Sequence, residues 1–235
     1  MINVSISYGF GDDNRYHSEN IPESIQLALY KYENYVKYRD TIFGSLEENN
    51  TNVRVTHLPL DTLKLPEENI CKMINQIFEK TGCVKYVVHP NNGMSYFVDQ
   101  FFQRCHSQTT LCIETFGWRS NKNLRSPLEI IEFMYNHQPS LRMTVDTSHI
   151  EELWFDTKIM PFLLRHTSVI HLSNRAKGYG QHLPFTSPHG NLNLVKFVKD
   201  LKYRYKWEGD IVLEYMPEHR HKLYKNAKYL KTLVN

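Results

Sequence analysis

The chain has 235 residues, of which 41% are hydrophobic, enough to bury one sizeable core, and we expect a single domain over 1–235. Its 28 Lys and Arg against 25 Asp and Glu give a net charge of +3, which permits a polyanionic partner without requiring one. No apolar run approaches about 18 residues, and the opening MINVSISYGF reads as a strand, so we expect no membrane span and a cytoplasmic or otherwise intracellular protein.

Seven short runs rich in β-branched and aromatic residues alternate with stretches of helical periodicity. TLCIET and GDIVLEY are apolar at almost every position, which is typical of parallel strands covered on both faces. Right-handed crossovers curl such units into a barrel or a doubly wound sheet, and we favour a compact α/β fold, a TIM-like (β/α) barrel of seven or eight parallel strands. The runs lie at about 3–9, 53–58, 84–89, 110–114, 141–146, 168–172 and 210–214.

Helix signals separate these runs. The segment SPLE at 126–129 combines an N-cap serine, a proline at the first helical position and a carboxylate at the third. Pro22 before SIQLALYKYENYVKY and Pro66 before EENICKMINQIFEK predict two further helix starts. An eighth strand is not evident, and we expect it either hidden near 40–45 or absent.

A long polar stretch at 175–193, RAKGYGQHLPFTSPHGNLN, stands out between the last two strands. Connections of that length in compact domains are usually functional. Because it follows the strand that carries His171, we expect it to lie over the mouth of a pocket.

The four cysteines, Cys71, Cys83, Cys105 and Cys112, form no CxxC pair. Three of them fall in helix or strand patterns, where a small apolar thiol packs well. We therefore expect reduced, structural cysteines rather than disulfides or a thiolate metal site.

Acidic and imidazole side chains recur at the ends of the successive strands. The carboxyl ends of parallel strands meet at one end of a barrel, so we expect these side chains to converge on a divalent-metal pocket. A catalytic ion needs about three protein ligands, so the set could serve two or three ions with Glu114 as a bridge. Five histidines against three carboxylates favour zinc, with manganese as the rival. The eight candidates are His57, His89, Glu114, Asp146, His149, His171, His182 and Glu214.

Simpler interpretations of these residues are also open. A single His or Glu that closes a strand is more often structural, and Glu114 and Glu214 could form a salt-bridged core with Arg119 or Arg142. The two glutamates could also work as a general acid and base. Their burial in apolar runs without a cation would carry a desolvation cost, which a metal would offset.

The series THLP, VVHP, IET, VDTSH, IHLSN, QHLP and VLEY, over about 53–215, resembles the xylose-isomerase-like TIM-barrel superfamily. Within it, the sequence is similar to the endonuclease IV branch of metal-dependent apurinic/apyrimidinic endonucleases. The resemblance implies hydrolysis of the phosphodiester 5′ to an abasic nucleotide flipped out of duplex DNA, as in DNA repair. It assigns His57, His89 and Glu114 to one ion, Glu114 with Asp146, His171 and Glu214 to a second, and His149 with His182 to a third.

We also expect particular residues to act on the substrate. Glu114, Glu214 and His149 are the expected catalytic groups. The expected substrate contacts lie in the segments that follow two of the strands, at Asn91, Asn174, Arg175 and Lys177.

Three features depart from the family pattern. Gly180 stands where the family carries an Asp, two residues before His182, so His189 or a water fills the third site or that site is weak. Asn174 stands where many relatives carry Asp. The chain is also shorter than typical members, which predicts trimmed DNA-contacting loops.

Three functions follow from these observations. The first is a metal-dependent phosphodiester hydrolase. It is favoured by the basic charge from residue 196 onward, where ten Lys and Arg stand against five Asp and Glu, and by the YRYKW segment at 203–207. The second is a sugar or sugar-phosphate isomerase or epimerase that uses one ion, with His57 and His89 binding substrate or incidental. The third is a barrel that binds metal or nucleic acid without turnover.

Overall fold

The computed structural model describes residues 1–9, 22–115, 124, 126–150, 155, 158–176 and 180–235. Its main sheet is formed by β1 (Ile2–Gly9), β2 (Ser24–Ala28), β3 (Asn52–His57), β4 (Lys85–Val88), β5 (Thr110–Glu114), β6 (Arg142–Asp146), β7 (Thr167–Leu172) and β10 (Gly209–Leu213).

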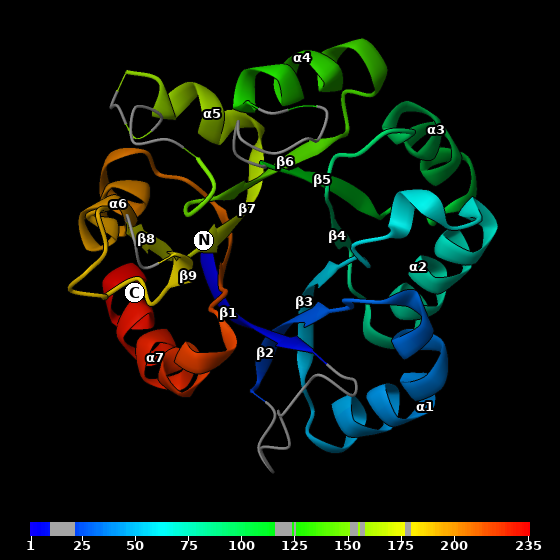
Figure 1. Ribbon diagram of the computed structural model, residues 1–235, viewed down its shortest axis with the longest axis horizontal. Coiled ribbons are helices and arrows are strands. Elements are labelled where there is room, and N and C mark those ends of the chain that lie inside the picture. The colour runs from blue at the N-terminus through cyan, green and yellow to red at the C-terminus, as the bar shows by residue number, and fades with distance from the viewer. Residues whose placement is uncertain (10–21, 116–123, 125, 151–154, 156–157, 177–179) are drawn as a thin grey trace.

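These eight strands close a parallel barrel in the order β1-β10-β7-β6-β5-β4-β3-β2, with the helices around the outside (Figure 1). The predicted TIM barrel is confirmed, and the seven predicted strands fall within two residues of the observed ones. Closure pairs β1 with both β10 and β2, so each of the eight described strands has a neighbour on both sides.

The eighth strand is β2, and the prediction of a helix that begins after Pro22 was wrong for 24–28. The expected hidden strand at 40–45 lies instead within α1 (Tyr32–Glu48). Alternate residues of β2 face opposite sides of the sheet: Ile25 and Leu27 join the hydrophobic core outside the barrel, while Gln26 is buried among polar side chains inside it. The continuous apolar run had concealed this change of element, because closure of the barrel decides it rather than local propensity.

The helices follow the predicted signals elsewhere. Ser126 accepts a hydrogen bond from the Glu129 backbone, and the Glu129 side chain accepts one from the Ser126 backbone, which completes the predicted capping box. The remaining helices are α2 (Glu67–Thr81), α3 (Met94–Arg104), α4 (Pro127–His137), α5 (Met160–His166), α6 (Leu194–Lys199), the π-helical η3 (Asp200–Arg204) and α7 (Leu223–Val234), with short 3-10 turns η1 (Thr62–Lys64) and η4 (Pro217–Lys222).

The interior of the barrel has a small apolar floor. It is formed by Val55, Val87, Cys112, Val169 and Val212, one from each of five strands. Side chains two residues apart on a strand point to the same face, so the residue two positions later, on the strand or just after its end, is expected directly above this floor. Those residues are five of the predicted ligands, namely His57, His89, Glu114, His171 and Glu214.

Among the described helices, none combines the length and apolar character needed to cross a membrane. All four cysteines are free, and three of them are buried, as expected.

Candidate metal centre

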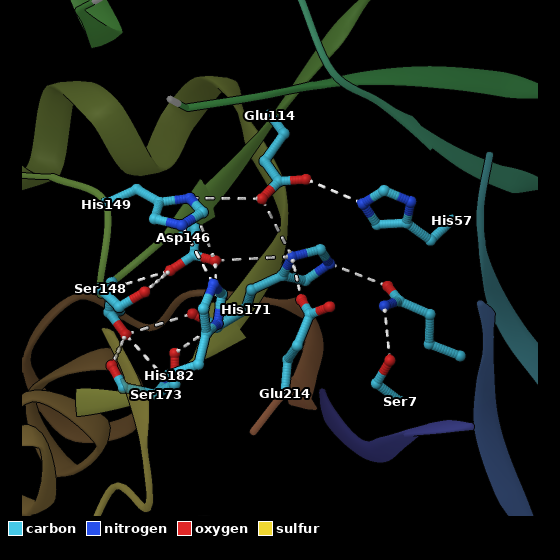
Figure 2. A network of polar contacts seen from close by, with 12 residues as sticks. Ser7, His57, Glu114, Asp146, Ser148, His149, His171, Ser173, His182 and Glu214 are labelled. Atoms are coloured by element: carbon cyan, nitrogen blue, oxygen red, sulfur yellow. Dashed lines mark hydrogen bonds and ion pairs between the residues drawn. The ribbon is translucent and has the colours of Figure 1, made fainter. Parts of the chain in front are cut away.

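All eight predicted ligands lie at the carboxyl end of the barrel. Apart from His89, their side chains are shown together in Figure 2. Glu114 and Asp146 end their strands, and His57 ends β3. His149 follows in the turn after Asp146. The hairpin of β8 (Asn174–Ala176) and β9 (Gly180–Leu183) brings in His182, so this part of the polar stretch lies beside the ligand cluster.

The side chains form three overlapping groups, within each of which the candidate ligand atoms lie no more than 4.8 Å apart. The groups are His57, His89 and Glu114; Glu114, Asp146 and His171; and Asp146, His149 and His182. Residues far apart along the chain therefore converge at one end of the barrel, as the strand-end pattern predicted.

Glu114 stands between two of these groups and turns one oxygen toward each. Its Oε2 lies 3.1 Å from His57 Nε2 and 3.0 Å from His89 Nε2. Its Oε1 lies 3.5 Å from His171 Nδ1 and 3.7 Å from His149 Nδ1. Two ligand atoms on one tetrahedral zinc ion are about 3.3–3.5 Å apart, so a carboxylate placed in this way fits a bridge between two cations.

In the second group and in Glu214 beside it, buried polar atoms make no hydrogen bond. These atoms are Asp146 Oδ2, His171 Nδ1 and Glu214 Oε2. Glu214 Oε2 is only 2.9 Å from His171 Nδ1, and Asp146 Oδ2 is 4.0 Å from the same nitrogen. Buried polar atoms are almost always satisfied, so this convergence is best explained by a cation among them.

Neighbouring groups fix the imidazole tautomers. His57 Nδ1 lies 2.8 Å from the Leu58 carbonyl, which can only accept, so Nδ1 donates and Nε2 is left to face Glu114. His171 Nε2 lies 2.8 Å from Gln26 Oε1, and Gln26 Nε2 in turn donates to Ser7 Oγ at 3.4 Å. Such outer contacts are typical of metal-binding histidines, because they direct the other nitrogen at the ion.

The third group is completed by Asp146 rather than by a residue at position 180. Ser148 donates to Asp146 Oδ1 from both its backbone nitrogen and its hydroxyl, which leaves Oδ2 facing the histidines. Oδ2 lies 3.4 Å from His149 Nδ1 and 3.8 Å from His182 Nδ1. His189 is exposed and joins none of the three groups, so the expectation that it replaces the family Asp finds no support.

His182 adopts a left-handed backbone conformation, with φ of 55°. A non-glycine residue in this region is uncommon, and such strain often marks functional sites. Its Nε2 lies 3.1 Å from His149 Nε2, so the hairpin backbone delivers the ring into the cluster.

The charges in the cluster shift one another's pKa values strongly. Burial opposes charge throughout, yet the nearby imidazoles, His89 first, hold the pKa of Glu114 well below its usual range. Against burial, the Asp146 carboxylate raises the pKa of His149 to about 9, and the carboxylates of Glu214 and Glu114 raise that of His171. A site that favours positive charge so strongly at its nitrogens is one that also favours a bound cation.

The alternative of a salt-bridged core is not supported by the described residues. Arg142 lies at the start of β6, where its guanidinium donates to the Pro139 and Leu141 carbonyls rather than to a ligand carboxylate. Arg119 falls outside the described residues.

The expected substrate contacts are less uniform. Asn174 is buried, and its side-chain amide bonds the Leu192 backbone on both sides, donating to the carbonyl at 2.9 Å and accepting from the N–H at 3.1 Å. It therefore holds the loop after β9 in place, and its contacts do not support the prediction that it touches substrate. Asn91 follows β4 and is half-buried, Arg175 is half-buried on β8, and Lys177 lies outside the described residues.

Sequence reasoning missed a second layer of residues around the ligands. Gln26 and Ser7 support His171, as described above. The half-buried Tyr30 hydroxyl accepts a hydrogen bond from Arg220 at 3.3 Å, and its pKa is raised by burial and by the negative charge of Glu214. The one available signal was the glutamine in the otherwise apolar SIQLA segment.

Comparison with known proteins bears on the fold. No family model matches the sequence. A search of curated proteins finds no match either. The structure resembles endonuclease IV from Thermus thermophilus with a TM-score of 0.63 and 14% identity, covering 89% of each chain. It also resembles a xylose isomerase-like TIM barrel protein from Mycobacterium smegmatis in complex with magnesium, with a TM-score of 0.64 and 9% identity over 90% of this chain and 83% of that one.

A third solved structure, the probable 3-DHS dehydratase AsbF of Bacillus anthracis involved in petrobactin synthesis, gives a TM-score of 0.61 and 15% identity. It covers 91% of this chain and 89% of that one. These neighbours differ in the activities their names state, and their identities are low. The chain thus has the fold of the xylose isomerase-like TIM barrels, endonuclease IV among them.

Proposed function

We propose that the protein is a metal-dependent phosphodiester hydrolase resembling endonuclease IV, which cleaves DNA 5′ to abasic sites. The observation that carries this proposal is the position of Glu114, whose two oxygens face separate sets of imidazoles. A bridging carboxylate serves a centre with two or more ions, and such centres are typical of phosphodiester hydrolysis. The resemblance to endonuclease IV in sequence pattern and fold supports the same choice.

Each ion would be held by a different set of residues. His57, His89 and Glu114 would hold one ion, Glu114 with Asp146, His171 and Glu214 a second, and Asp146 with His149 and His182 a third. When bound, these ions would activate water and stabilise the negative charge that develops on the phosphate. Zinc is the first metal to test, because histidines outnumber carboxylates in the set.

The chain's own groups would orient the substrate and move protons. Glu214 is the most exposed of the three carboxylates, with a side chain 18% exposed against 2% for Glu114 and 0% for Asp146. It is therefore the carboxylate best placed to accept a proton from the attacking water. Arg175 lies on β8, which begins beside the cluster, and its cationic side chain would hold a backbone phosphate.

A second candidate is a sugar or sugar-phosphate isomerase or epimerase with one ion. Asp146, His171 and the neighbouring Glu214 each have a buried atom without a hydrogen bond, so the site these residues form with Glu114 is the best defined for a single cation. In that case Glu114 and Glu214 would transfer the proton next to a carbonyl, and His57 and His89 would contact substrate.

The test combines elemental analysis with a nicking assay on a duplex that contains one abasic site. We expect at least two ions per chain and a nick on the 5′ side. His89→Ala should remove one ion and abolish nicking, because the first group loses a ligand. His189→Ala is the matched control, since this exposed histidine belongs to no group, and it should keep both.

One ion per chain, unchanged by His89→Ala, together with no nicking, would favour the isomerase. That protein should then interconvert sugar or sugar-phosphate substrates and lose this activity in Glu214→Gln.

A further inference from the structure

The amino-terminal end of the barrel, opposite the metal centre, carries two adjoining cavities of about 630 and 680 Å³. Both lie against the first residues of strands, with Ser24 and Asn52 lining one and Arg142 and Thr167 the other. Their volumes are in the range of small-ligand sites. The two cavities adjoin because they share three lining residues, Lys206, Trp207 and Glu208.

The two cavities are lined by seven basic residues and one acidic residue. We call the surface formed by these eight residues the basic face. The single acidic residue, Glu208, forms an ion pair with the Met1 amino group. Two of the cations also have partners, since Arg54 pairs with Asp210 and Arg142 bonds backbone carbonyls. The other five, which form no ion pair with any described residue, are Arg165, Lys202, Arg204, Lys206 and Lys231.

The positive charge of the basic face also affects a neighbouring histidine, His166. The pKa of His166 is lowered, first by burial and then by the charges of Arg142 and Arg165. Cations at helix ends such as Arg165 and Arg204 can stabilise a helix through its dipole. The same explanation covers Lys202 and Lys231, in the last turns of η3 and α7. It does not cover Lys206, which lies in the segment after η3 and lines both cavities.

The junction of the two cavities is held rigidly. Lys206 has φ of 53°, a left-handed conformation that a glycine would adopt without strain. The Trp207 indole donates to the Thr167 carbonyl at 3.0 Å, and a Cβ at Gly209 would come within 2.4 Å of the Trp207 ring. A lysine kept in a strained conformation, beside a locked tryptophan, points to a use for its charge.

We propose that the basic face is a second ligand site, which binds molecules with more than one phosphate group, with phosphates in both cavities and Lys206 between them. Clustered Arg and Lys side chains that lack acidic partners are the usual receptors for phosphate oxygens. Two sources share this chemistry, a nucleotide and the backbone of a short nucleic-acid strand. Because the face lies at the other end of the barrel, the site is separate from the proposed metal centre and goes beyond the proposed function.

The first test compares two double variants with the same change of charge. Arg165→Glu/Arg204→Glu alters the basic face, whereas Lys72→Glu/Lys80→Glu alters exposed residues of α2. Binding of thymidine triphosphate is measured by calorimetry, and binding of fluorescein-labelled penta-thymidylate by anisotropy, on the metal-loaded protein at low and moderate salt.

We expect the basic-face variant to bind at least one probe about tenfold more weakly than wild type and the α2 variant to bind like wild type. The probe that wild type binds more tightly identifies the source of the phosphates. If penta-thymidylate is that probe, the loss of two phosphate contacts should reduce its salt slope by about 1.4. Equal binding by both variants, or no binding of either probe by wild type at low salt, would overturn the proposal.

A second variant keeps the proposal testable if the double variant fails to fold. Lys206→Gly removes one charge and relieves the left-handed strain, so the melting temperature should hold or rise while binding weakens about threefold or more. Unchanged binding in this variant would show that Lys206 does not contact the ligand. Nicking of abasic DNA is a separate readout, which should be the same in all of these variants.

Discussion

The two ends of the barrel interior differ in whether their buried charges have partners within the chain. At the amino end, the buried Asp210 accepts hydrogen bonds from Arg54 and Lys85, so the chain supplies its own cations. At the carboxyl end, three carboxylates face five imidazoles, and several buried atoms there make no hydrogen bond. The comparison indicates that the first cluster is complete as folded and stabilises the barrel, whereas the second has the residue types and the unsatisfied atoms that the proposed cations would need.

The apolar floor keeps these clusters apart. Val212 lies between Asp210 on β10 and Glu214 just after it, and Val87 lies between Lys85 on β4 and His89 just after it. Because neither set of charges can neutralise the other across this layer, changes at one end should leave the other end intact. The predictions below test this independence.

The largest effect is expected from Glu114→Gln. The amide keeps the shape of the side chain but removes the charge that both neighbouring groups share, so at least one ion should be lost and activity should fall about a thousandfold or more. Elemental analysis and the nicking rate measure this. Glu214→Gln, which touches one group only, should cause a smaller loss of metal. If Glu114→Gln retained the full ion count, the carboxylate would not be a bridge.

At the opposite end, Asp210→Asn should destabilise the fold without loss of metal. It leaves Arg54 and Lys85 without their counter-charge, and because both are partly exposed we expect about 2–3 kcal/mol off the free energy of unfolding. Urea unfolding measures this, with Asp200→Asn as control. Asp200 forms an exposed pair with Lys196 at 2.7 Å, so its loss should matter by less than about 0.5 kcal/mol. A drop in zinc content in Asp210→Asn would contradict the independence of the two ends.

Gln26→Ala should weaken metal binding without removing a ligand. The substitution frees His171 Nε2 from its 2.8 Å partner, and loss of such an outer contact typically lowers metal affinity about 10–100-fold. Competition with a chromophoric chelator measures the affinity. Gln26→Glu, which restores an acceptor at the same place, should recover much of it. Equal affinity in Gln26→Ala and wild type would mean that the tautomer of His171 is fixed in another way.

The smallest single step is the graded dependence of metal affinity on pH, which is expected to change by about tenfold for each pH unit. In the metal-free protein the Asp146 carboxylate raises the pKa of His149 to about 9 despite burial, so below that pH a proton occupies the ring and must leave when an ion binds. Zinc affinity should therefore fall as pH falls from about 9 to about 6, by about tenfold per unit for each proton displaced. Affinity that is flat over this range would show that no imidazole proton is exchanged for the ion. The Asp210 cluster contains no histidine and should not contribute.

Much of the fold and the convergence of the ligands could be predicted from the sequence. Strands buried on both faces are recognisable from composition, and parallel strands bring their ends together whatever their separation along the chain. Strand β2 escaped prediction because its apolar residues run on into the next helix, and only closure of the barrel distinguishes them. The roles of Gln26, Ser148 and Asn174 depend on contacts between elements, which no local pattern encodes. The same holds for the third group, where Asp146 rather than residue 180 provides the carboxylate.

The most direct test of the account is anomalous diffraction at the zinc edge from crystals of the zinc-loaded protein. We expect a peak on each side of Glu114, one beside His57 and His89 and the other among Asp146, His171 and Glu214. A single peak, or peaks that do not contact Glu114, would contradict the central claim that this carboxylate joins two ions.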